Sequence, residues 1–198
     1  MTNVIGFADG ENLVLRYQDM VKEGRTPRAG TVHVRDLVAW HPDITQVYLC
    51  EIARFSFYQT VVGDDLAIAG AKQAILEVPF RYQHTHAHGG GNLAPRVFKK
   101  GAREAKTKSV DINLTIDMMR HAANPNFDVL YLLSGDGDYL PLIEEVTRMG
   151  KQVWLGAFSK GFNSNLKYAA DDFFDLDPIF FSATGSNNAL QPAAPNTA

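Results

Sequence analysis

Four carboxylates stand out as residues that could do chemistry together: Asp9, Asp111, Asp136 and Asp138. Asp9 directly follows the apolar run Val4–Ala8, and the Ser-Gly-Asp-Gly-Asp segment with Asp136 and Asp138 directly follows the run Val129–Leu133. Carboxylates crowded into one place repel each other, and burial raises their pKa values further unless a cation compensates. Carboxylate oxygens are the ligands that Mg²⁺ and Mn²⁺ prefer. The acids therefore predict one divalent-metal site, provided that the fold brings them together.

Each aspartate also has a simpler interpretation. Asp138 could cap a helix that carries Pro141 in its first turn, and Asp111 could cap the helix that it begins. Asp9 or Asp136 could close a turn through its own backbone. These roles explain the acids one at a time, whereas a metal ion explains all four together.

The elements that must position these acids are alternating strands and helices. Short apolar runs predict buried strands at Val4–Ala8, Gln46–Ile52, Val129–Leu133 and Val153–Phe158. Helix-like stretches lie at Leu13–Val21, Val32–Trp40, Asp64–Leu76 and Leu140–Met149. Residues 109–123 alternate like a strand but run on through a helix-prone segment, so we predict a helix there. The order predicts an α/β fold, a mainly parallel sheet flanked by helices on both faces, with its site beyond the carboxyl ends of the strands.

Other features bound the domain and its compartment. We expect one domain over residues 1–180 and a disordered tail over residues 181–198, where no apolar period continues. No apolar run is long enough to span a membrane, and the N-terminal segment has no signal-peptide pattern. The single cysteine, Cys50, lies in an apolar run and is expected to be buried. These features predict a cytoplasmic protein.

Basic residues gather in the middle of the chain, although the net charge of the whole is −3. Residues 81–110 carry a net charge of +6 and the remaining residues −9. This separation predicts either a surface that binds phosphates next to an acidic centre or a solvated basic loop. The candidate substrate-binding bases are Arg96, Lys99, Lys100, Arg103 and Lys108.

A histidine-rich stretch at residues 84–95 is expected to be an exposed loop or hairpin tip. On an extended strand His84, His86 and His88 would share one face and could bind a transition metal. We favour a solvated loop, because three glycines follow and no cysteine or acid lies nearby.

Four segments of the chain, in order, are FADGENL, KSVDINLTIDMM, LLSGDGDYLPLIEEVTRMGKQV and SNLKYAADDFFDL. They resemble the NYN domain family in its LabA-like (DUF88) branch, within the PIN-like nuclease superfamily, over about residues 3–177. The resemblance implies that the family's metal-binding acids fall on Asp9, Asp111, Asp136 and Asp138. Asn12 and Ser134 match further family positions, taken here as substrate-binding, and Asp117 matches another whose reach to the metal is open.

Two small departures separate the chain from the family pattern. The usual Lys-Gly-Val-Asp is Lys108-Ser109-Val110-Asp111 here, and the common Asp-Phe is Asp138-Tyr139. Neither departure removes an acid.

The resemblance implies a Rossmann-like PIN fold and Mg²⁺- or Mn²⁺-dependent cleavage of RNA, single-stranded or structured, that leaves a 5′-phosphate. An alternative is an RNA-binding regulatory module of the same fold with little or no turnover, although such a module would be expected to lose acids. An aspartyl-phosphate phosphatase lacks support, because FADGE has no second aspartate two residues after Asp9. No membrane partner is expected, and a homodimer stays open.

Overall fold

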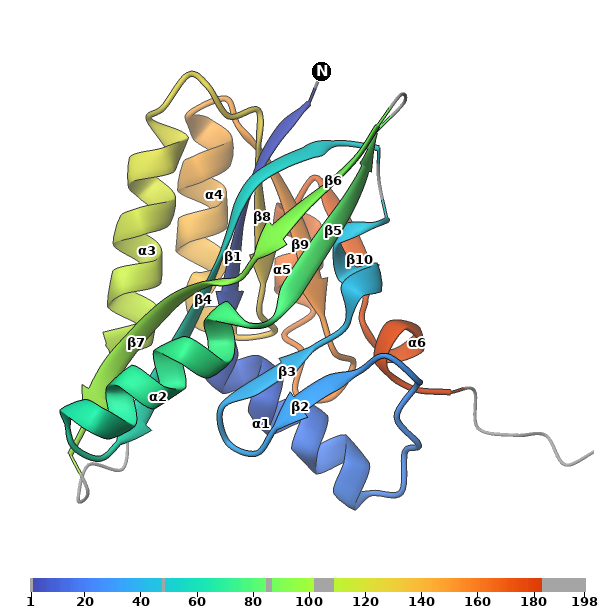
Figure 1. Ribbon diagram of the computed structural model, residues 1–198. Coiled ribbons are helices and arrows are strands. Elements are labelled where there is room, and N and C mark those ends of the chain that lie inside the picture. The colour runs from blue at the N-terminus through green and yellow to red at the C-terminus, as the bar shows by residue number, and fades with distance from the viewer. Residues whose placement is uncertain (1, 48, 85–86, 102–108, 183–198) are drawn as a thin grey trace, which may run out of the picture.

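The computed structural model describes residues 2–47, 49–84, 87–101 and 109–182. At its centre lies a six-stranded sheet in the order β10-β9-β8-β1-β4-β7, in which each neighbouring pair is parallel (Figure 1). Its strands are β1 (Asn3–Asp9), β4 (Glu51–Val62), β7 (Ala94–Lys100), β8 (Val129–Leu133), β9 (Gln152–Ala157) and β10 (Asp172–Asp175). The predicted parallel sheet is thereby confirmed.

Helices cover both faces of the sheet, as its two-sided strand pattern requires. They are α1 (Gly10–Lys22), α2 (Asp65–Leu76), α3 (Ser109–Ala122), α4 (Leu140–Arg148), α5 (Asn165–Ala169) and α6 (Asp177–Phe180). Successive residues of β8 alternate between two cores: Tyr131 packs in the cluster that includes α1 and α2, and Leu132 in the cluster with α3, α4 and α5. Among the described residues, no helix has the length and apolar character needed to cross a bilayer.

Strand β1 lies where the order in which the chain adds strands to the sheet reverses. The chain passes from β1 through α1 to β4 and through α2 to β7, so it first builds one side of the sheet. It then returns through α3 to β8, on the other side of β1, and continues outward to β9 and β10. Parallel sheets of this kind bind ligands where the order reverses, at the carboxyl ends of the two central strands.

Two predicted elements were wrong. Val32–Trp40 is not a helix but the hairpin β2 (Val32–Val34) and β3 (Val38–Trp40), because Asp36 takes a left-handed φ of 56° that turns the chain back. The strand predicted at Gln46–Ile52 begins only at Glu51, where β4 starts to pair with β1. Before it, Val47 and Leu49 are on the surface, with Leu49 63% exposed, whereas Cys50 is buried.

Two further predictions are confirmed, and two concern segments that lie partly outside the described residues. The helix over 109–123 is α3, and Cys50 is buried. The 84–95 stretch contributes to the hairpin of β5 (Pro79–His84) and β6 (Ala87–Asn92), with residues 85–86 outside the described range. Residues 183–198, most of the predicted tail, also lie outside it, whereas Phe181 is buried in the core.

Candidate active site

The ends of β1 and β8 meet at the switch point and bring two acidic segments together. Ala8 of β1 lies opposite Leu133 of β8, so Asp9 and Ser134 are the next residues at the same edge. Gly10 makes this close packing feasible, because a Cβ there would lie 2.5 Å from the backbone oxygen of Tyr58 on β4.

Asp9 is a buried carboxylate with two hydrogen-bond donors. It caps α1, where its Oδ1 accepts from the Asn12 backbone N–H at 3.0 Å, and its Oδ2 accepts from the Ser134 hydroxyl at 3.0 Å. Asp9 is only 3% exposed, and this burial raises its pKa to about 7. The two hydrogen bonds oppose this rise, and the negative charges of Asp111 and Glu11 add to it. Asp9 therefore lies in surroundings that favour an added cation.

Asn12 and Ser134 join the two strand ends. The Asn12 Oδ1 accepts from the Gly135 backbone N–H at 3.1 Å, and the Ser134 Oγ accepts from the Asp136 N–H at 3.2 Å. Both side chains therefore hold the Ser-Gly-Asp-Gly-Asp turn in place against Asp9. Their predicted contact with substrate stays a prediction.

Asp136 and Asp138 occupy one tight turn. Asp136 caps the 3-10 helix η2 (Gly137–Tyr139), where its Oδ1 accepts from the Asp138 N–H at 3.0 Å. Gly137 is required, because a Cβ there would lie 2.1 Å from Asn163 Nδ2. Asp138 is exposed and does not cap α4, which begins after Tyr139 without a side-chain cap.

Tyr139 connects α3 to this turn and was not singled out from the sequence. Its hydroxyl donates to Asp111 Oδ1 at 3.3 Å, although Tyr139 is only 2% exposed. Burial raises the pKa of Tyr139, and the negative charges of Asp9, Asp111 and Asp136 raise it further. These three acids thus act on one hydroxyl from β1, α3 and η2. The signal in the sequence was the tyrosine in place of the family's common phenylalanine.

The predicted substrate-binding bases do not all lie in one place. Arg96 of β7 forms an ion pair with Asp117 Oδ2 at 3.3 Å, while Lys99 is exposed and Lys100 lines a cavity beside α1. Arg103 and Lys108 lie outside the described residues.

Asp117 belongs to a separate cluster. It accepts from the Tyr58 hydroxyl at 3.0 Å and pairs with Arg120 at 3.4 Å as well as with Arg96. Its partners are therefore on β4, β7 and α3, and none of them is one of the other predicted acids.

Comparison with known proteins assigns the chain to a family. The NYN domain family matches residues 4–177, which covers both acidic segments and α3. The chain belongs to the NYN domain family.

Two further proteins are similar to this chain, one in sequence and one in fold. An uncharacterized protein of Methanocaldococcus jannaschii is 32% identical over 62 residues, which are 31% of this chain and 26% of that protein, so the match spans about a quarter of its length. A crystal structure of a protein of unknown function from Vibrio parahaemolyticus superposes with a TM-score of 0.55 at 18% identity, over 91% of this chain and 96% of that chain. NYN domains belong to the PIN-like nucleases, which are generally divalent-metal-dependent enzymes acting on RNA.

The donors of this NYN domain are carboxylates from β1, α3 and the turn after β8. Within the described ranges, no three histidine, cysteine, aspartate or glutamate side chains stand close enough to bind one ion together. The donor chemistry nevertheless fits Mg²⁺ or Mn²⁺, because such ions usually keep several waters and use one or two carboxylates directly. Asp9 is buried, and its charge acts on the Tyr139 hydroxyl together with those of Asp111 and Asp136. A cation bound here would offset this concentration of negative charge.

Proposed function

We propose that this NYN domain is a metal-dependent ribonuclease that hydrolyses RNA phosphodiester bonds at the carboxyl edge of its sheet. The observation that carries the proposal is the buried Asp9 carboxylate, which has Asp111 for a charged neighbour and the turn of Asp136 hydrogen-bonded to it through Ser134. Negative charges beside a polyanionic substrate repel it, and a cation bound to the acids offsets this repulsion.

The ion would be held by Asp9 and Asp136, with Asp111 and Asp138 completing its surroundings. When bound, Mg²⁺ or Mn²⁺ supplies positive charge to a phosphate oxygen and makes a water molecule more acidic.

The protein's own side chains would hold the acids in position and accept a proton from the attacking water. Asn12 and Ser134 keep Asp9 and the Asp136 turn together, and Tyr139 holds Asp111 by its hydroxyl. Asp138, which is exposed, would take a proton from the attacking water. Water adds across the P–O3′ bond: its oxygen joins phosphorus, and O3′ leaves with a proton as an alcohol. The products are a 5′-phosphate and a 3′-hydroxyl.

Cations along β7 would bind the RNA backbone without reading its sequence. Lys99 and Lys100 are at the end of β7, and Arg96 keeps 44% of its side chain exposed despite its ion pair. Lys108, just before α3, would offset negative charge on the phosphate.

The test is cleavage of an end-labelled single-stranded RNA and of its DNA counterpart with Mn²⁺, with Mg²⁺ and with EDTA. We expect metal-dependent RNA cleavage that Asp136→Asn abolishes. Asp128→Asn is the matched control, because Asp128 precedes β8 at the opposite edge of the sheet, where its carboxylate accepts from the Asn3 backbone N–H at 2.9 Å. Cleavage that survives in EDTA or in Asp136→Asn would reject the proposed site.

A second candidate is an RNA-binding regulatory module without turnover. It is favoured by the lack, among the described residues, of three acids already spaced to bind one ion. RNA binding without cleavage under any metal condition would select this candidate.

A further inference from the structure

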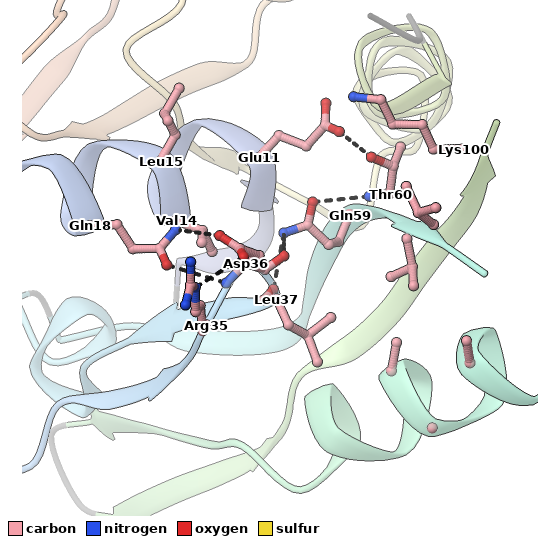
Figure 2. A pocket seen from close by; sticks show the side chains of 15 residues that line it. Glu11, Val14, Leu15, Gln18, Arg35, Asp36, Leu37, Gln59, Thr60 and Lys100 are labelled. Carbon is pink, nitrogen blue, oxygen red and sulfur yellow. Dashed lines mark hydrogen bonds and ion pairs between the residues drawn. The ribbon is translucent and has the colours of Figure 1, made fainter. Parts of the chain in front are cut away.

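A cavity of about 720 Å³ adjoins the candidate active site on the side of α1 and α2. Its boundaries are the first half of α1, the turn between β2 and β3, the end of β4 and one side of α2 (Figure 2). Glu11, two residues after Asp9, lines this cavity and accepts a hydrogen bond from the Thr60 hydroxyl. Thr60 lies two residues beyond Tyr58, which pairs with Asp9 across the sheet. The Glu11 end of the cavity therefore lies next to Asp9.

The lining has apolar walls, a polar end, and further polar residues at Gln18, Arg35, Asp36, Gln59 and Lys100. The apolar lining residues are Val14, Leu15, Leu37, Val61, Val62, Ala67 and Ala71. Glu11 and Thr60 supply polar groups at the end nearest Asp9. Arg35 and Lys100 lie on different sides of the cavity, Arg35 beside Asp36 and Lys100 above Thr60 (Figure 2). A nucleobase has the matching chemistry, with apolar faces, N–H donors on its edge and a phosphate on either side.

The wall that carries Leu37 is fixed without a ligand. The Gln18 amide donates to Asp36 Oδ1 at 3.0 Å and the Gln59 amide donates to the Leu37 carbonyl at 3.1 Å, so α1 and β4 both hold the turn (Figure 2). Asp36 takes its left-handed conformation within this turn. A wall fixed in advance lowers the entropy cost of binding.

We propose that this cavity receives one unpaired base of the RNA, so that the protein binds single-stranded RNA in preference to duplex. The proposal rests on the proposed function for its choice of RNA as ligand. Glu11 accepts an N–H of the inserted base, and Arg35 and Lys100 contact the phosphates on its two sides. A base inside a duplex enters only after unpairing and unstacking, and this cost weakens the binding of duplex RNA.

Gly70 offers a way to fill the cavity without damaging the fold. It lines the cavity in the middle of α2, and a Cβ at this position would meet no atom within 4 Å. Phenylalanine has a higher helix propensity than glycine, so Gly70→Phe is expected to keep α2 intact. Ala69→Phe is the matched control, because Ala69 is an exposed neighbour on α2 outside the lining.

The experiment measures fluorescence anisotropy, with Ca²⁺ in place of Mg²⁺ or Mn²⁺, for three probes: a labelled single-stranded RNA, the same RNA in a duplex, and an abasic oligomer of equal length. We expect the wild type and Ala69→Phe to bind the single strand at least about tenfold more tightly than the other two probes, the effect of one well-held base. Gly70→Phe should lose this preference and bind the abasic oligomer as the wild type does. Thermal unfolding monitored by circular dichroism verifies that both variants are folded.

Each outcome decides between the two proposals. Base-dependent binding that Gly70→Phe removes, in a protein that cleaves no RNA, supports the base site and rejects the nuclease. Metal-dependent cleavage with a Gly70→Phe variant that keeps the single-strand preference supports the nuclease and overturns the base site. Equal binding of all three probes by the wild type, or no binding of any, also overturns the base site.

Discussion

Helix α3 carries two aspartates that have the same kind of tyrosine partner but different charges around them. Asp111 accepts from the Tyr139 hydroxyl at 3.3 Å, and Asp117 accepts from the Tyr58 hydroxyl at 3.0 Å. Asp117 is also paired with Arg96 and Arg120, at 3.3 Å and 3.4 Å. Asp111 has no ion pair among the described residues and instead acts on the buried carboxylate of Asp9.

We propose that this difference separates a structural acid, Asp117, from a functional one, Asp111. At Asp117 the protein itself supplies the compensating cations, so the cluster is complete. Around Asp111 negative charges are brought together, which lowers stability unless a cation arrives from solution. Carboxylates left uncompensated on this scale are typical of functional sites.

The largest expected effect compares Asp9→Asn with Asp117→Asn. Asp9→Asn removes a charge that would hold the ion, so RNA cleavage should fall by at least about a hundredfold. Asp117→Asn should leave cleavage within about threefold, because the amide still accepts from Tyr58 and the loss is mostly that of exposed ion pairs. Single-turnover rates with Mn²⁺ measure both. A large loss in Asp117→Asn would place this cluster in the catalytic machinery.

A second prediction concerns stability without metal. Burial raises the pKa of Asp9 from 3.8 to about 7, so between these values the folded protein holds a proton that the unfolded chain has released. Stability should therefore fall as the pH rises through this window, by up to about 4 kcal/mol. Urea unfolding in EDTA, repeated across the window, measures the fall.

Two comparisons sharpen this result. Asp9→Asn should remove most of the pH-dependent fall, and Mn²⁺ should restore stability to the wild type at the upper end of the window. An equal fall in wild type and Asp9→Asn would assign the pH dependence to other groups.

The smallest expected effects come from the two tyrosines. Tyr139→Phe removes a hydrogen bond to Asp111, so the Mn²⁺ concentration for half-maximal cleavage should rise by about two- to tenfold. Tyr58→Phe should instead lower the free energy of unfolding by about 1 kcal/mol and leave the Mn²⁺ requirement unchanged. Metal titrations and urea unfolding of both variants separate the two roles, and the reverse pattern would contradict the comparison.

The position of a site residue could be predicted from the sequence where the end of a strand alone sets it. Asp9 directly follows one buried apolar run and Asp136 lies in the turn that follows another, so their place at one sheet edge could be predicted from strand ends and glycines. The hairpin at Val32–Trp40 could not, because its turn depends on amides from α1 and β4 that are distant in the chain. For the same reason the ion pair of Arg96 with Asp117, which joins β7 to α3, left no local signal.

The most direct test of the central claim is a crystal structure with Mn²⁺, whose anomalous scattering locates the ion independently of activity. We predict a peak at the switch point, within bonding distance of carboxylate oxygens of Asp9 and Asp136, that is lost in Asp9→Asn. A peak at another place, or none at saturating Mn²⁺, would contradict the account.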